Sequence, residues 1–528
     1  MTRVLESGPR NQLRVRLSEC VGALLWLLWR PSSVTILLAL LALLFRFYGV
    51  QQANDVFIDE VTYAEMARQM ADGQLPSILG SPFFLHPPGS FALNAVFIRL
   101  FGLTGTSMDL ALQLRWVNAV LGVLTVVVCV VVVRRLVGLA PAVFAGAILA
   151  SDPFVLRMDG RLMMETPAGL AVLTGWLIVL QALGQSPGRR RVLLEVAGGL
   201  VFGLALVTKD MTVMFTVVPM LAAVLWRRSL QPLTAVRVIA CTLVPYLVYL
   251  SVITSAGLLP DFVDQKAVGV LRITGAMQMT GFNSVTGTDL AGRLVELSDR
   301  FGTSYILLAL SVVSGALAAT SRVHIRRVIG LYSFISGLVG TYSVLFGAAE
   351  EQFGYCVVLA AVVSTPIAAL MVLERRYSAR RLLVSAAGLM TVVSLALGLQ
   401  ARLAVDDGLL RARDFLTTRL PPDSKVGLTT VTGEFALLPH ENWEVDPSLK
   451  SLRAKGAEYV LTQGRQLREG YGFAAPELVE WLQANAEPVY SFTGPTSGDT
   501  VVWRLDRSKL DAAVEAGHTI PPVTGGYP

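Results

Sequence analysis

The chain carries a series of long apolar segments, and this feature restricts it to a membrane. A helix needs roughly 20 mostly apolar residues to cross a bilayer. About eleven segments approach or reach this length, the third of them being short. The sequence therefore predicts a polytopic α-helical membrane protein with about eleven transmembrane helices, which cover residues 34–50, 115–133, 137–150, 163–183, 193–208, 211–226, 238–256, 303–320, 328–346, 355–373 and 382–403.

Arginines gather in the loops that follow every second apolar segment, and the N-terminus is basic as well. Such loops stay on the cytoplasmic side. We therefore expect a plasma-membrane protein with its N-terminus in the cytoplasm and its C-terminus outside, with the long loops 51–114 and 257–302 also outside. The arginines are Arg134, Arg135, Arg189, Arg190, Arg191, Arg227, Arg228, Arg237, Arg322, Arg326, Arg327, Arg375, Arg376, Arg380 and Arg381.

Composition divides the chain into a membrane body, 34–404, and two flanking parts. Charged residues make up only 16% of it, against roughly 25% in soluble proteins. The net charge of +6 is explained by the arginine loops, so no nucleic-acid partner is expected. Residues 1–33 should be cytoplasmic, with an amphipathic helix over 13–30 on the membrane surface. The apolar stretch 87–101, which contains Arg99, should lie at the outer interface. The four cysteines show no zinc or disulfide spacing.

The last part, 405–528, predicts a small extracytoplasmic α/β domain. Strands are expected at 425–431, 457–462, 488–493 and 500–505, and helices at 409–419, 447–455 and 476–486. The second helix should be capped by Asp446, with Pro447 in its first turn. Residues 507–528 are expected to be loose. A stabilising or partner-binding role is the simplest one for this domain.

A carboxylate pair opens the first long outer loop, which reads FIDEVTYAEMARQM at 57–70. Asp59 and Glu60 would lie at the start of a helix, where the helix dipole favours negative charge. Tyr63 shares one helical face with apolar residues at 66, 67 and 70. The pair is either a solvated helix cap or a functional pair of carboxylates at the membrane surface.

Further ionisable residues recur in the outer loops. FFLHPPGSF at 83–91 sets a histidine before two stiffening prolines, and SDPFVLRMDGRLMMETPAGL at 151–170 sets two arginines before an acid. A lysine follows in GLALVTKDM, and the last outer hairpin is FGAAEEQFGYC. Charges at a membrane are costly, so these are functional candidates, although structural or snorkelling roles are also open. They are His86, Arg157, Arg161, Glu165, Lys209, Glu350, Glu351 and Tyr355.

Taken in order, these motifs resemble the GT-C superfamily of integral-membrane glycosyltransferases, in the branch of aminoarabinose lipid A transferases and protein O-mannosyltransferases. The resemblance covers most of residues 30–375. It implies a catalytic base at Asp59 with Glu60 supporting it, a second acid at Glu165, and Lys209 near the donor phosphate. The family often has Lys where this chain has His86, and Arg-Tyr where it has Gly354-Tyr355.

These expectations combine into one reading of the chemistry. A polyprenyl-phosphate sugar would be the donor, and a glycan, lipid or protein the acceptor. Cations suit the donor phosphate, namely Lys209, His86, Arg157 and Arg161. Tyr63, Glu350, Glu351 and Tyr355 would line the substrate pocket. The sequence assigns no metal ligands, and it leaves open whether a divalent metal takes part. The alternatives are a transporter of a lipid-linked or anionic substrate, although no repeat between the halves supports it, and a non-enzymatic envelope scaffold.

Overall fold

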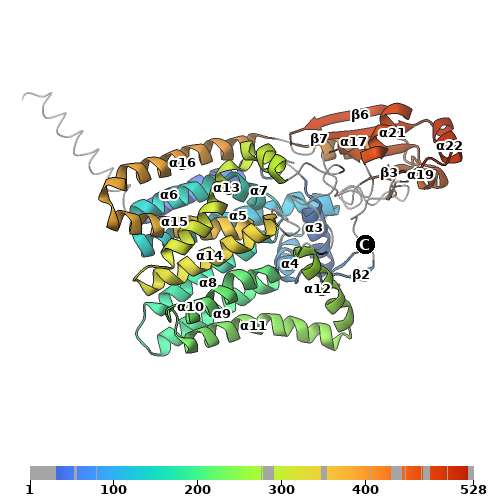
Figure 1. Ribbon diagram of the computed structural model, residues 1–528. Coiled ribbons are helices and arrows are strands. Elements are labelled where there is room, and N and C mark those ends of the chain that lie inside the picture. The colour runs from blue at the N-terminus through green and yellow to red at the C-terminus, as the bar shows by residue number, and fades with distance from the viewer. Residues whose placement is uncertain are drawn as a thin grey trace, which may run out of the picture.

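A computed structural model describes residues 31–520 apart from 53–55, 79, 275, 277–289, 346–353, 405, 430–442, 446–447, 465–466, 468–475 and 496–497. The expected interfacial helix at 13–30 and the residues Glu350 and Glu351 lie outside this part of the chain. The described residues form a bundle of long helices with a small sheet at one end (Figure 1). The predicted class, a polytopic helical membrane protein with a small C-terminal α/β part, is confirmed.

Every predicted transmembrane segment is helical. The helices are α2 (Pro31–Phe47), α5 (Ser107–Val137), α6 (Leu139–Ser151), α8 (Glu165–Leu183), α9 (Arg189–Thr208), α10 (Val213–Leu225), α11 (Pro232–Ser255), α13 (Leu290–Ala318), α14 (His324–Leu345), α15 (Gly354–Arg375) and α16 (Arg380–Leu403). Among the described residues, eight helices are long and apolar enough to cross a membrane by themselves. A ninth span is formed if α6 and α7 (Pro153–Asp159), which meet at a bend of 58°, count as one.

The bundle is packed around α15 and exposes apolar surface on its outer helices. Helix α15 contacts α5, α6, α8, α13 and α14, and most of its residues are buried. Glycines bring neighbouring helices close, as is usual where no water drives association. A side chain at Gly315 or Gly330 would overlap the backbone of the facing helix in the α13–α14 pair. By contrast, α11 and α16 lie at the edges of the bundle and expose many leucines and valines, as lipid contact requires.

The loop between α2 and α5 forms short elements at the end of the bundle where the sheet lies (Figure 1). They are α3 (Ile58–Ala71), a small hairpin of β1 (Ser77–Ile78) and β2 (Ser81–Pro82), and α4 (Gly89–Phe101). Helix α12 (Leu259–Ile273) lies at the same end. Its Gln265 fixes the chain after β2, because its side chain accepts from the Phe84 amide at 2.6 Å and donates to the Pro82 carbonyl at 2.7 Å.

The C-terminal part is a five-stranded mixed sheet in the order β4-β3-β5-β7-β6. The strands are β3 (Val426–Leu428), β4 (Trp443–Val445), β5 (Tyr459–Gln463), β6 (Ala486–Gly494) and β7 (Gly498–Leu505). The four predicted strands are confirmed, and β4 is added. Strand β3 pairs in parallel with β4 and β5, whereas β7 pairs antiparallel with β5 and β6.

Helices cover both faces of this sheet. Because side chains alternate along each strand, neighbouring residues of a strand contact helices on opposite faces. Helix α17 (Gly408–Arg419) packs on the face that carries Leu461 and Val502. Helices α19 (Leu449–Lys455), α21 (Pro476–Asn485) and α22 (Arg507–Glu515) pack on the other face, which carries Val460 and Trp503. The core under α17 also contains Val56, Val61 and Met108, so the sheet is attached to α3 and α5.

Two details of this part differ from expectation. The N-cap of α19 is Ser448, whose hydroxyl accepts from the Ser451 amide, rather than Asp446. Residues 507–515 form α22 instead of a loose end, because Asp506 caps the helix and Leu510 is buried against the sheet. The sequence pattern missed this helix because it is short and its first turn is basic.

Candidate active site

The start of α3 holds the carboxylate pair, and its two members are in different surroundings. Glu60 is fully buried and accepts four hydrogen bonds. Two come from Arg115, with Nε at 2.9 Å and Nη2 at 2.5 Å, and two come from the amides of Phe57 and Leu162, both at 3.2 Å. Asp59 is only partly buried. Glu60 therefore fastens three separate chain segments together, whereas Asp59 keeps access to solvent.

Tyr63 and His86 come together one helical turn further along α3. Tyr63 is buried, with its ring 6.0 Å from the His86 imidazole and 5.5 Å from the Phe91 ring. Met164, which precedes Glu165, belongs to the same cluster. The two predicted residues are thus neighbours, and their surroundings are mostly apolar.

Glu165 and Lys209 form a buried ion pair at the ends of α8 and α9. Glu165 starts α8 and Lys209 follows the last residue of α9, so the pair joins two helix ends. The second carboxylate oxygen of Glu165, Oε2, is buried without a hydrogen-bond partner among the described residues. Gly89, in the first turn of α4, lies against the Val207 carbonyl, which a Cβ would approach to 2.6 Å. The His86 segment is therefore beside Lys209.

A second ion pair, which sequence reasoning missed, lies next to Lys209. Lys266 of α12 donates to Asp210 at 2.6 Å and to the Leu85 carbonyl at 3.0 Å, and Tyr246 donates to Asp210 at 2.7 Å. Burial lowers the pKa of the Lys266 ammonium, while the Asp210 carboxylate opposes that shift. Lys266 is far from the other motifs in sequence, and only its place in the outer loop 257–302 gave a signal.

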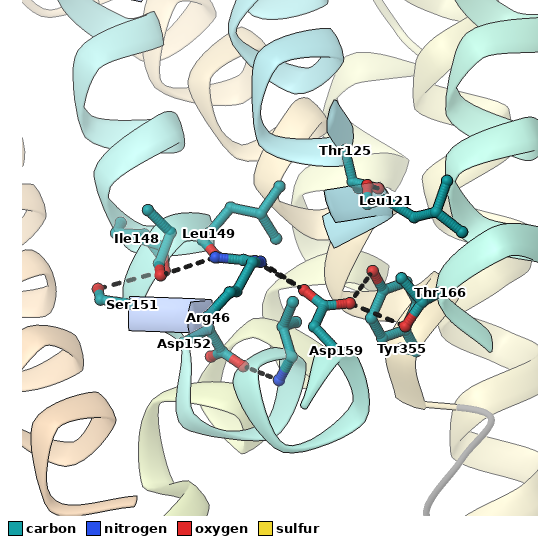
Figure 2. Close-up of polar contacts among 12 residues, drawn as sticks. Arg46, Leu121, Thr125, Ile148, Leu149, Ser151, Asp152, Asp159, Thr166 and Tyr355 are labelled. Atoms are coloured by element: carbon teal, nitrogen blue, oxygen red, sulfur yellow. Dashed lines mark hydrogen bonds and ion pairs between the residues drawn. The ribbon is translucent and has the colours of Figure 1, made fainter. Parts of the chain in front are cut away.

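Tyr355 lies in the interior of the bundle, in a network around Asp159 (Figure 2). Its hydroxyl and that of Thr166 each donate to Asp159 Oδ1 at 2.8 Å, and Arg46 Nε donates to Oδ2 at 2.8 Å. Arg46 also donates to the carbonyls of Leu149 and Ala150, at 3.3 and 3.1 Å. The network joins α2, α6, α7, α8 and α15. Asp159 and Arg46 had no assigned role in the sequence.

Arg157 and Arg161 line a cavity at the junction of the bundle and the C-terminal sheet. Arg157 lies over the Phe301 ring at 5.4 Å, and Arg161 lies over the Phe57 ring at 5.2 Å. The lining of this cavity does not include Lys209, His86 or Glu165. In the described part of the chain, no three His, Cys, Asp or Glu side chains gather as a metal site.

Comparisons with known proteins show which fold this chain shares. The fold matches apo ArnT from Cupriavidus metallidurans with a TM-score of 0.55 and 16% identity, covering 92% of this chain and 99% of that one. The same ArnT bound to undecaprenyl phosphate gives 0.53 and 16%, covering 90% and 97%. The oligosaccharyltransferase AglB from Archaeoglobus fulgidus, in complex with an inhibitory peptide and a dolichol-phosphate, gives 0.54 and 13%, covering 90% and 74%. The chain has the fold of the GT-C membrane glycosyltransferases.

Within that class, residues 36–259 match the family model of dolichyl-phosphate-mannose-protein mannosyltransferases. The match contains α3, the His86 segment, Glu165 and Lys209. The resemblance indicated by the sequence motifs is thus confirmed. A comparison with curated protein sequences gives no significant match.

Proposed function

We propose that this protein transfers a sugar from a polyprenyl-phosphate donor to an acceptor at the outer face of the plasma membrane. The observation that carries the proposal is the difference in burial and hydrogen bonding between two neighbouring carboxylates. Glu60 is held by four hydrogen bonds and Asp59 is partly exposed beside it. A general base must reach the acceptor, and this condition favours Asp59 over Glu60.

The proposed reaction has one displacement step. Asp59 takes the proton from an acceptor hydroxyl or amine, and the acceptor atom attacks the anomeric carbon of the donor sugar. The bond from that carbon to the phosphate oxygen breaks, and polyprenyl phosphate leaves with its electron pair. Cations near the leaving group stabilise the charge that it gains. The resemblance implies inversion at the anomeric carbon.

Lys209 and His86 are the proposed contacts of the donor phosphate. The Lys209 ammonium is already set against Glu165, which keeps it in place when no donor is bound. A donor phosphate that approaches Lys209 would bind the same ammonium group as Glu165. In this proposal Glu165 is the second acid of the site, and its role is to orient the Lys209 side chain. The fold neighbour ArnT is solved with undecaprenyl phosphate, which supports a donor of this kind.

The outer-face location rests on the arginine loops. The basic loops, such as the one at the start of α9, lie at the end of the helices opposite to Lys209. The positive-inside tendency would place that end in the cytoplasm. Helix α3, which carries Asp59, and the sheet lie together at the other end of the bundle (Figure 1), and this end would then face outside.

A transfer assay on the purified full-length protein tests the function. The protein is reconstituted in liposomes with undecaprenyl phosphate carrying a labelled hexose or pentose, and with lipids and glycans extracted from cell envelopes as acceptors. We expect labelled product and an equal amount of released undecaprenyl phosphate with at least one donor. Vesicle uptake of the labelled donor, with neither transfer nor release, would contradict the proposal and favour a transporter.

A further inference from the structure

The cavity between the helix bundle and the sheet has a strongly cationic lining. Its volume is about 190 Å³. The walls come from the turn after α7, the region around Phe301, where α13 is kinked, the end of α16 and Pro495 after β6. The charged residues among them, in the described part of the chain, are five arginines and one aspartate: Arg115, Arg157, Arg161, Arg300, Arg402 and Asp299.

Arg402 is a deeply buried arginine in the wall of this cavity. Its side chain leaves α16 near the last turn and is 95% buried, with 5% exposed. Nη2 donates to the carbonyls of Arg46 and Tyr48, at 3.1 and 2.5 Å. Within the described part of the chain, Nε has no hydrogen-bond partner and no carboxylate lies in ion-pair range of this guanidinium. A buried charge without a counter-charge is costly, so this position points to an anion from outside the chain.

The other arginines are fixed in place around the same cavity by contacts from different elements. Arg115 is held by Glu60, at 2.9 and 2.5 Å. Arg300 Nη2 donates to the Pro495 carbonyl at 2.5 Å, which ties α13 to the sheet. Arg157 and Arg161 lie over aromatic rings. The guanidinium groups are therefore preorganised, and less entropy is lost when a ligand binds to them.

Gly160 creates the space that lets Arg402 reach the cavity. It lies in the turn between α7 and α8, and a Cβ there would come within 2.6 Å of Arg402 Nη1. Gly398, one turn before Arg402, lies directly against the backbone of α6 at Ser151. These two close approaches position the end of α16, and they offer a way to displace the guanidinium without removing its charge.

We propose that this cavity binds a phosphate or phosphodiester group carried by the acceptor, separate from the phosphate of the donor. A carboxylate has two oxygens, which one arginine fork satisfies. A tetrahedral phosphate offers more oxygens in several directions, which suits guanidinium groups from several elements. The cavity volume of about 190 Å³ is well above the roughly 10–15 Å³ that a cavity needs to hold one water, so there is room for a phosphate group.

The role as acceptor site rests on the proposed transferase function and assigns Arg157 and Arg161 to the acceptor instead of the donor. The cavity adjoins the start of α3, because Arg115 binds Glu60 and Arg161 covers Phe57. Asp59 lies between Phe57 and Glu60 in the sequence. A phosphate held here would bring the attached acceptor to the proposed base, and Lys209 would hold the donor from its own position.

Binding measurements on the full-length protein in phosphatidylcholine nanodiscs test the site without any turnover. The probes are dioctanoyl phosphatidic acid, inorganic phosphate and the neutral dioctanoylglycerol, titrated by calorimetry. We expect the phosphate lipid to bind and the neutral lipid not to bind. Comparable binding of inorganic phosphate would show that the anion alone suffices, whereas binding of the lipid alone would show that its headgroup is the ligand. Equal binding of the neutral lipid would overturn the proposal.

Three variants locate the bound anion. Arg157→Gln and Gly160→Ala should each weaken binding of the phosphate lipid, the former by about ten- to a hundredfold. Arg411→Gln is the matched control, because Arg411 is exposed near the same junction and pairs with Asp407, and its binding should be unchanged. Gly160→Ala keeps every charge, so its effect would report the position of Arg402 in particular.

Donor competition separates this inference from the proposed function. Saturating undecaprenyl phosphate should leave binding of phosphatidic acid in place, and so should Lys209→Ala. Loss of phosphatidic acid binding in Lys209→Ala, with normal binding in Arg157→Gln, would overturn the cavity as an anion site while leaving the transferase proposal intact. A failed transfer assay with arginine-dependent phosphate binding would keep the anion site and remove its role in catalysis.

Discussion

Glu60 and Arg115 form a bidentate ion pair that is almost completely shielded from solvent, with side-chain exposures of 0% and 1%. The pair fastens α3 to α5, and the Leu162 amide extends it to the turn after α7. A buried ion pair of this kind adds little net stability by itself, but removal of one partner leaves an uncompensated charge. Glu60 therefore fixes the start of α3, which carries Asp59.

Glu60→Gln should destabilise the protein by about 3–5 kcal/mol, because the Arg115 charge stays buried without its partner. The double variant Glu60→Gln, Arg115→Met should recover part of this loss. Thermal unfolding in detergent checks both. Below the unfolding temperature, the turnover of Glu60→Gln should fall less than that of Asp59→Asn. Equal stability of Glu60→Gln and the unmodified protein would contradict the structural role.

Tyr355→Phe should lower stability by about 0.5–3 kcal/mol, because Asp159 loses one of its hydrogen bonds while the aromatic ring keeps its packing. The Asp159 network is buried inside the bundle (Figure 2), so the variant should leave the apparent affinity for the acceptor unchanged. Unfolding and steady-state kinetics measured on the same preparation decide this. A raised KM with normal stability would instead place Tyr355 in the substrate pocket.

Lys209→Ala should weaken donor binding by about ten- to a hundredfold, equivalent to about 1.5–3 kcal/mol for one charged contact. Glu165→Gln removes the partner of Lys209 and should leave donor affinity equal or higher, because the ammonium no longer has a competing carboxylate. Binding of undecaprenyl phosphate to both variants checks whether the two substitutions change the donor affinity in these different ways. Lys509→Ala in α22 serves as the control. Unchanged donor affinity in Lys209→Ala would remove it from the site.

The transmembrane topology is tested by labelling single cysteines from outside intact cells. In a background without the four native cysteines, Asp261→Cys in α12 and Lys509→Cys in α22 should react with a membrane-impermeant maleimide. Arg190→Cys, at the arginine-rich end of α9, should react only after the membrane is opened. Labelling of Arg190→Cys in intact cells would reverse the orientation and move the proposed site to the cytoplasm.

The sequence was sufficient for the membrane helices because their signal is local. Each predicted span is helical, since about 20 apolar residues in a row leave the backbone no other way to satisfy its hydrogen bonds in lipid. The strands at residues 459–463 and 498–505 were also predictable from alternation. The cap at Ser448 and helix α22 were missed, because short elements at a chain end depend on tertiary contacts such as that of Leu510 with the sheet.

Partners of the candidate residues could not be predicted, because they come from distant parts of the chain. Nothing near Glu60 indicates that Arg115 will bind it, and nothing near Tyr355 indicates Asp159. Arg402 lies at the end of α16, the last of the predicted membrane helices, and had no motif around it, yet it meets Arg157 and Arg161 in one cavity. Topology predicted which end of the bundle these residues share, and only packing determined which of them meet.

The central claim, that Asp59 is the general base, is tested most directly by single-turnover transfer in Asp59→Asn. Asparagine keeps the shape of the side chain but cannot take a proton, so transfer should slow by about 10²–10⁴-fold while donor binding is largely retained. The variant should also unfold at the same temperature as the unmodified protein, since the buried carboxylate is that of Glu60. Near-normal single-turnover transfer in Asp59→Asn would contradict the account and leave Glu60 or Glu165 as the base.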